Sequence, residues 1–117
     1  MELLPQAIRD RLPALYSNEA LGLRALAQVK FFTPDSNWTW YASEGSPVDE
    51  DGNYDTDKEK VGFILFGLVV GFEMELGYFD LGELEEVRGP LNLPVERDLY
   101  FKPKPLEELM ALHSRKG

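Results

Sequence analysis

The chain has 117 residues, with 12 Lys and Arg against 21 Asp and Glu, and its formal net charge is −9. It is 44% hydrophobic and contains no cysteine, which excludes disulfide scaffolds, thiolate zinc sites and cysteine nucleophiles and argues against wholesale disorder. The length predicts one domain spanning residues 1–117.

The N-terminal segment is predicted to form a helix. Leu4, Ile8 and Leu12 recur at helical spacing, and Pro13 ends the pattern because the residue before a proline avoids the helical region. Residues 16–22 are expected to be a connector. No basic leader followed by an apolar stretch precedes the helix, so the segment does not predict a signal peptide.

A hairpin is expected next. Residues 29–33 alternate in the manner of a strand, residues 37–41 alternate again, and the intervening residues 33–36 carry Pro and Asp at turn positions. The alternation places Trp38 and Trp40 on one face, where we expect at least one of them to belong to the core.

The middle of the chain predicts a loop and then a central strand. Residues 43–60 are almost entirely polar and are expected to form a long, flexible loop. Residues 61–72 are apolar at both parities, as in a buried strand, with Gly67 as a bulge or a site of close backbone approach. This apolar run is about half the ~20 residues that a membrane helix needs. A turn at 73–77 and a short strand at 78–79 should follow.

Two further helices are expected. Asp80 and Glu83 have the spacing of a capping box, and Gly89 followed by Pro90 should end that helix. Residues 99–101 form a possible edge strand. A last helix is expected to begin at Pro105, with an apolar face and a basic tail at 114–117; the face consists of Leu106, Leu109, Met110 and His113. The predicted fold is therefore α+β, an antiparallel sheet of about four strands with N-terminal, middle and C-terminal helices packed on it.

The charge is concentrated in residues 44–86, which hold 13 of the 21 acidic residues and two lysines, so this segment carries −11 and the remainder +2. Such a surface disfavours duplex nucleic acid and suits a basic protein partner. The leading hypothesis is a non-enzymatic binding protein; the alternative is that the acidity only maintains solubility. The residues proposed to contact a partner are acidic: Asp49, Glu50, Asp51, Asp55, Asp57, Glu73, Glu75, Glu83 and Glu86, with Glu85 beside them.

The aromatic hairpin gives a second hypothesis, a binder of nucleic acid or of a small ligand. Tryptophans stack on planar groups, and nearby basic residues could supply charge. The residues of this alternative site are Lys30, Trp38, Trp40, Arg97 and Lys102. For Arg97 we favour a structural role over ligand binding, because it is expected to pair with acids such as Glu83 or Glu86.

Motifs for catalysis, metals and cofactors are not found. The single histidine, His113, has no partner motif and no Gly-x-Ser-x-Gly elbow accompanies it, so no triad is predicted. The acidic loop resembles part of an EF-hand, but with Gly52 as sixth position the first and twelfth positions are Pro47 and Lys58, where carboxylates are required. We expect no enzyme, no cofactor and no metal. A carboxylate-based metal enzyme is a third, weaker alternative.

Three segments together carry a resemblance to a known family: FFTPDSNWTWY, FGLVVGFEMELGYFDLGELEEVRGP and ERDLYFKPKPL. They resemble a family of short bacterial proteins of unknown function found on plasmids, phages and other mobile elements. The resemblance covers most of the chain outside 44–60 and implies no catalytic residue. It implies a bacterial cytoplasmic protein encoded by a mobile element. In that setting, the leading hypothesis becomes that the acidic −11 segment imitates nucleic acid and inhibits a host nucleic-acid-binding protein.

Overall fold

The computed structural model describes residues 1–115, so the expected basic tail is described only as far as Arg115 and its last two residues lie outside the described part. Two antiparallel sheets and four short helices form the fold, which confirms the α+β class and corrects the strand number. The main sheet has five strands in the order β5-β4-β3-β2-β6. These are β2 (Val29–Phe32), β3 (Thr39–Val48), β4 (Gly62–Val70), β5 (Met74–Asp80) and β6 (Glu96–Arg97). The remaining elements are the β1 (Leu26–Ala27) and β7 (Lys104–Pro105) pair, α1 (Gln6–Arg9), the 3-10 helix η1 (Glu19–Arg24), α2 (Leu81–Glu86) and α3 (Leu106–Ser114).

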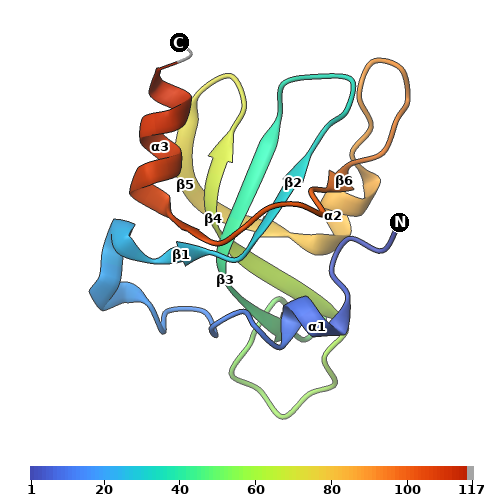
Figure 1. Cartoon of the computed structure of the whole chain (residues 1–117). Coiled ribbons are helices and arrows are strands. Elements are labelled where there is room, and N and C mark those ends of the chain that lie inside the picture. The colour runs from blue at the N-terminus through green and yellow to red at the C-terminus, as the bar shows by residue number, and fades with distance from the viewer. Residues whose placement is uncertain (116–117) are drawn as a thin grey trace.

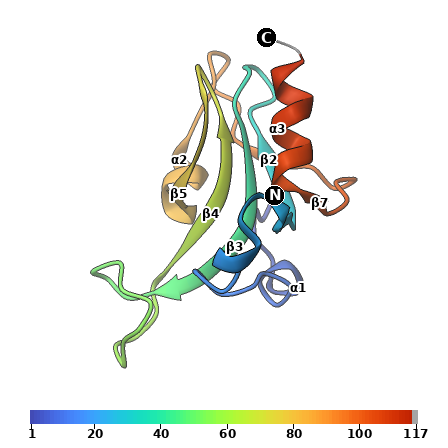
Figure 2. The same cartoon turned by 90° about the vertical axis from the view of Figure 1, so that its left-hand side faces the viewer.

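The main sheet has an apolar cluster on each face. Figure 1 shows the strands side by side, and Figure 2, seen along the sheet, shows α2 and α3 on opposite sides of it. Leu81 and Leu84 of α2 pack with the N-terminal segment on one face, and Leu106 and Leu109 of α3 pack on the other. Both faces of β4 are therefore covered, which explains why its sequence is apolar at both parities.

The central strand runs where the apolar pattern predicts it, and Gly67 is a site of close backbone approach. A Cβ atom at this position would lie 1.8 Å from the carbonyl oxygen of Tyr41 on β3. The irregularity of the ladder lies on the neighbouring strand, since the register of β3 shifts between Ala42 and Glu44. The absence of a side chain at Gly67 thus lets the irregular part of β3 pack closely against β4. The bulge itself lies in β3.

The prediction of a loop over 43–60 is wrong for its first six residues. They extend β3 to Val48, and Glu44 and Ser46 are buried. Ser46 Oγ accepts a hydrogen bond from the backbone N–H of Leu15 at 3.0 Å, and the Glu44 carboxylate accepts two more from the same N-terminal segment. These polar side chains accept hydrogen bonds from a chain segment about 30 residues away. The sequence predicted a loop because polar residues are common in loops, and it does not show these distant partners. The loop proper spans residues 49–61.

Element boundaries around β5 also differ from the sequence-based expectation. The predicted turn at 73–77 is mostly strand, and the reversal occurs at residues 71–73, where Gly71 N donates to Glu73 O at 3.0 Å. The capping prediction is confirmed for Asp80, whose Oδ1 accepts from the Glu83 N–H at 3.2 Å; the return bond from the Glu83 side chain, which a complete capping box requires, is not shown. The helix that it caps ends at Glu86, before the predicted glycine stop.

The two ends of the chain contain shorter elements than expected. The N-terminal helix is a single turn, α1, and residues 16–22 overlap the 3-10 helix η1. Residues 99–101 form a turn, and the edge strand is the two-residue β6, which pairs with β2. Leu99 and Tyr100 are exposed at this turn. Apolar and aromatic residues are common in strands, which is why the sequence predicted one here.

The last helix begins directly after Pro105, as predicted. Leu106 and Leu109 are buried, and His113 at the end of the helix lies 2.6 Å from the hydroxyl of Tyr41, measured to its Nε2 atom. Burial and the nearby charge of Asp98 raise the pKa of Tyr41 to about 12, so this phenol stays protonated at neutral pH. His113 thus joins α3 to the centre of the sheet.

Candidate functional site

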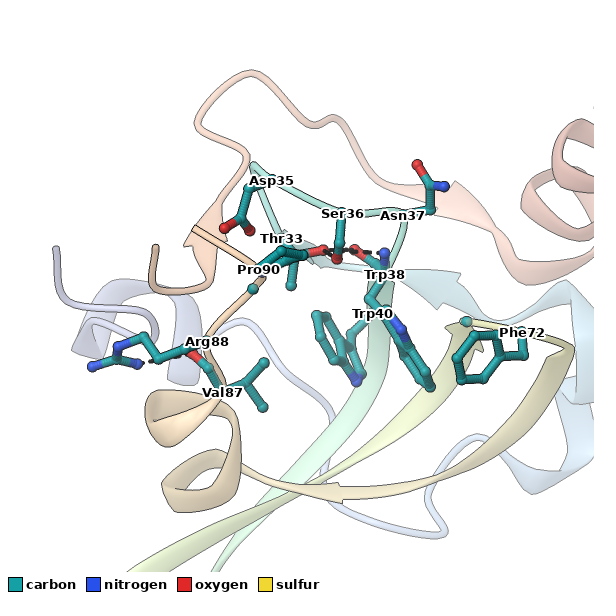
Figure 3. A pocket seen from close by; sticks show the side chains of 12 residues that line it. Thr33, Asp35, Ser36, Asn37, Trp38, Trp40, Phe72, Val87, Arg88 and Pro90 are labelled. Carbon is teal, nitrogen blue, oxygen red and sulfur yellow. Dashed lines mark hydrogen bonds between the residues drawn. The ribbon is translucent and has the colours of Figure 1, made fainter. Parts of the chain in front are cut away.

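A pocket of about 780 Å³ lies at one end of the sheet, where three chain segments meet (Figure 3). Its walls come from residues 33–38 of the β2–β3 turn, from residues 71–72 of the β4–β5 turn, and from residues 87–90 after α2, together with Trp40. Side chains and backbone from three distant parts of the sequence therefore enclose one space.

Aromatic rings form one wall of this pocket. Trp38 and Trp40 are stacked, with ring centroids 5.9 Å apart and planes at 27°, and Phe72 meets Trp38 edge-on at 5.6 Å. Figure 3 shows the three rings in a row. Trp40 is buried, as expected of one tryptophan, whereas Phe72 is 96% exposed. A fully exposed phenylalanine at the end of an aromatic row is an apolar surface available for contact.

The β2–β3 turn holds the tryptophans in place through Thr33. Its Oγ1 accepts a hydrogen bond from the Trp38 N–H at 3.1 Å and lies 2.5 Å from Ser36 Oγ, while its own N–H donates to Trp38 O at 3.0 Å. Gly71 is needed on the opposite side, because a Cβ atom there would lie 2.3 Å from the Trp38 ring. The row of rings is thus fixed by both turns.

Asp35 joins the turn to the segment after α2. Its Oδ2 accepts a hydrogen bond from the Leu91 N–H at 2.7 Å, and its carboxylate lies against Gly89, where a Cβ would be 1.7 Å from Oδ1. Arg88 points away from the rings (Figure 3) and donates to the carbonyl oxygens of Glu85 and Val87. Thr33, Ser36 and Arg88 are used to build the pocket, whereas Asp35 Oδ1 is buried without a hydrogen-bond partner. The exposed surface left for a ligand consists mainly of the aromatic rings.

The basic residues of the hairpin hypothesis do not line this pocket. Lys30 Nζ lies 3.6 Å from Asp98 Oδ2 and faces the ring of Tyr41 on the other side of β2. Arg97 donates to the carbonyl oxygens of Glu2 and Leu3, so its expected pairing with acids of α2 is wrong. Lys102 is exposed after the 99–101 turn. The sequence therefore correctly predicted that the two tryptophans lie together, but the basic residues expected beside them lie elsewhere.

The acidic residues are divided between the two ends of the molecule. Residues 49–61 leave the sheet at the end where β4 begins, and Glu73 lies in the turn at its other end, with Glu75 opposite Val69 (Figure 1). A second hollow of about 600 Å³ lies between the loop and the start of α2. It brings together Glu50, Asp51, Asp80 and Glu85, with Arg9 and Lys60 also in its lining. Exposed acids of the same region are Asp55 and Asp57 on the loop and Glu83 and Glu86 on α2.

Asp49 occupies a different position from the other loop acids because it is buried. Its Oδ1 accepts hydrogen bonds from the backbone N–H groups of Asp51 at 2.9 Å and of Asn53 at 3.0 Å. The Asn53 N–H lowers the pKa of this carboxyl most, and the Asp51 N–H, the Thr56 hydroxyl and the Lys58 charge lower it further against the opposing effect of burial. Asp49 therefore organises the loop.

Two absences concern the described residues 1–115. No group of three or more His, Asp or Glu there is arranged to hold a metal ion. None of the helices in that range has the length and apolar character needed to cross a bilayer.

The sequence model of a family described as "Protein of unknown function (DUF2958)" matches residues 3–117. The chain belongs to this family. Its membership of DUF2958 confirms the resemblance to a family of unknown function that the aromatic hairpin and the two later segments indicated, and the family description assigns no activity, no site residue and no genetic setting. No curated protein and no solved structure matches the chain.

Phe72 is the pocket residue that sequence reasoning missed. It stands at the end of an apolar run, and the run was interpreted as core throughout. The signal that could have separated Phe72 from the core strand is its position between Gly71 and Glu73, because a glycine close to a polar residue often marks a turn.

Proposed function

We propose that this DUF2958 protein is a non-catalytic binding protein that takes the planar aromatic group of a small ligand into the pocket at Trp38, Trp40 and Phe72. One observation carries the proposal: an almost fully exposed Phe72 ring continues a stacked tryptophan pair along the wall of a 780 Å³ pocket. Stacking on aromatic side chains stabilises a bound base by about 1–3 kcal/mol.

The charges nearby favour a ligand without phosphate. Glu73 follows Phe72 directly in the β4–β5 turn, and Asp35 lies on the opposite wall. Arg88, the basic residue of the lining, is held by backbone carbonyl groups. A nucleoside or a similar uncharged ring compound therefore suits the pocket better than a nucleotide, whose phosphate would meet carboxylates.

Tryptophan fluorescence tests the proposal, with adenosine and guanosine as probes and their 5′-monophosphates for comparison. We expect saturable quenching by a nucleoside, weaker binding of the monophosphate, and about tenfold weaker binding by Phe72→Ala, which corresponds to about 1.4 kcal/mol. Tyr100→Ala is the matched control, because Tyr100 is also highly exposed but belongs to the turn after β6. A flat titration with both nucleosides, or equal loss in the two variants, would contradict the proposal.

A second candidate function is docking of a basic partner protein on the acidic loop and α2. The observation that favours it is the hollow in which Glu50 and Asp51 of the loop approach Glu85 of α2. Opposite charges across such a surface accelerate association and make it sensitive to salt. In its more specific version, this candidate function is the displacement of a host DNA-binding protein from its DNA site by the acidic surface.

Charge reversal tests the second candidate. Pull-down of basic proteins from a bacterial lysate should fall with rising salt and should fall further in Asp55→Lys/Asp57→Lys. The control is Glu107→Lys/Glu108→Lys on α3, which changes the net charge by the same amount elsewhere. Equal binding by both double variants would show that only net charge matters and would reject a specific surface.

A further inference from the structure

Three tyrosines from distant parts of the chain gather beside the acidic loop. Tyr16 comes from the N-terminal segment, Tyr54 from the loop and Tyr78 from β5, and their side chains are 44%, 45% and 53% exposed. The Tyr16 ring centroid lies 5.6 Å from that of Tyr54 and 6.1 Å from that of Tyr78. Together they line a hollow of about 360 Å³ whose wall also includes Ile64.

The rings are held by the sheet and by a buried carboxylate. Glu44 Oε1 accepts a hydrogen bond from the Tyr16 N–H at 3.1 Å, and Oε2 accepts from the Asn18 N–H at 2.6 Å. Tyr16 has a φ of 70°, which is uncommon for a residue with a side chain. Glu44, Phe66 and Tyr78 form a row across three neighbouring strands, with the Phe66 and Tyr78 rings 4.9 Å apart. These contacts fix the hollow before any ligand binds.

The electrostatic environment of the hollow is negative. Asp55 belongs to its lining. A hydrogen bond with Tyr16 raises the pKa of Tyr78 to about 12, and burial and the charges of Glu44 and Glu19 act in the same direction. Within residues 1–115, no lysine or arginine is part of this lining. The nearest basic residue along the loop, Lys58, pairs with Asp51 at 2.9 Å.

Aromatic faces in a negative environment select one kind of ligand. The ring faces attract a cation through their quadrupoles, most strongly where water is partly excluded. An anion would be repelled by the carboxylates. Tyrosine is also enriched at the centres of protein interfaces, where one or a few residues dominate binding.

We infer that the hollow formed by Tyr16, Tyr54 and Tyr78 binds a cationic side chain, an arginine or lysine of a protein partner, through the faces of the three rings. This inference rests on the second candidate function, the docking of a basic partner, and adds the residues that anchor it. The loop acids would then attract the partner over distance, and the tyrosines would hold one of its side chains.

The test is an NMR titration of the ¹⁵N-labelled chain with N-acetyl-arginine amide, using N-acetyl-glutamine amide as the uncharged comparison. We expect saturable shifts centred on the amides of Tyr16, Tyr54 and Tyr78 with the arginine compound alone. Tyr54→Leu should weaken binding at least fivefold, and since Tyr54 lies on an exposed loop this substitution leaves the core intact. Tyr54→Phe, which keeps the ring, should bind like the wild type, and Tyr100→Leu serves as a control outside the hollow.

Three results would overturn the inference: equal shifts with the uncharged compound, shifts spread over loop and α2 acids without the tyrosines, or unchanged affinity in Tyr54→Leu. The lysate experiment distinguishes failure of the tyrosine anchor from failure of the acidic docking surface. Loss of the tyrosine shifts with salt-dependent capture retained rejects the anchor alone. Retained tyrosine shifts with capture unaffected by Asp57→Lys/Glu86→Lys, two exposed acids outside the hollow, support the cation site and reject the acidic docking surface.

Discussion

Asp49 begins the acidic loop and fixes its conformation by accepting hydrogen bonds from the N–H groups of two residues that follow it. An aspartate that bonds backbone two residues on forms an Asx turn, a local alternative to regular structure. This residue was grouped with the partner-binding acids because of its charge. Its burial instead gives it a structural role, so the proposed docking surface consists of the exposed loop acids.

We predict a pH-dependent effect of Asp49→Asn. The pKa of Asp49 is lowered in the folded protein, so the ionised carboxylate stabilises the fold at pH values above the usual aspartate pKa of about 4. This contribution is lost as the pH falls through the lowered folded-state pKa. The difference in unfolding free energy between wild type and variant, measured by urea denaturation, should be largest near pH 7 and shrink on acidification below about pH 4. A difference independent of pH would show that the charge of Asp49 has no role.

At the level of elements, the contact between β3 and β4 shapes the sheet. β3 is hydrogen-bonded to β2 in its first half, and in its second half Gly45 N donates to the Pro13 carbonyl at 2.9 Å. The register shift after Ala42 separates the halves, and Gly67 on β4 lies opposite. The N-terminal segment therefore covers a strand edge that would otherwise have unpaired backbone groups.

Gly67→Ala should destabilise the protein strongly, because its Cβ would lie 1.8 Å from a backbone oxygen that cannot move alone. We expect a loss near the upper end of the ~1–3 kcal/mol typical of overpacking, measured by urea denaturation. Gly77→Ala is the matched control: Gly77 pairs with Gly67 across the ladder, and a Cβ there meets no atom within 4 Å. Similar losses in both variants would mean that the general effect of glycine replacement, and not the contact with β3, is being measured.

At the level of the whole molecule, the aromatic pocket and the acidic loop occupy opposite ends of the sheet (Figure 1). The residues near the N-terminus complete the core between these ends. Leu3 and Leu4 are buried in the cluster beneath α2, and Arg97 of β6 holds their segment through its carbonyl oxygens. The two proposed binding surfaces can therefore be changed one at a time without altering this core.

Leu4→Ala tests how much the packing of the N-terminal segment contributes to stability. Leu4 is fully buried, so removing its side chain should cost about 2–5 kcal/mol in unfolding free energy. Leu91→Ala, at an exposed leucine, should change it by no more than about 0.5 kcal/mol. Thermal and urea denaturation measure both. A small effect of Leu4→Ala would indicate that the N-terminal segment is only loosely attached.

Several features could be predicted from the amino-acid sequence alone: the α+β class, the hairpin with paired tryptophans, the central strand, the capped middle helix and the start of the last helix. Periodicity, prolines and caps act within a few residues, so they can be recognised locally. Three features could not be predicted in this way: Glu44 and Ser46 belong to a strand, Phe72 completes an aromatic wall, and three tyrosines meet beside the loop. Each of these depends on contacts between residues far apart in the chain, and hydrogen bonding or burial from a distant segment can override local polarity.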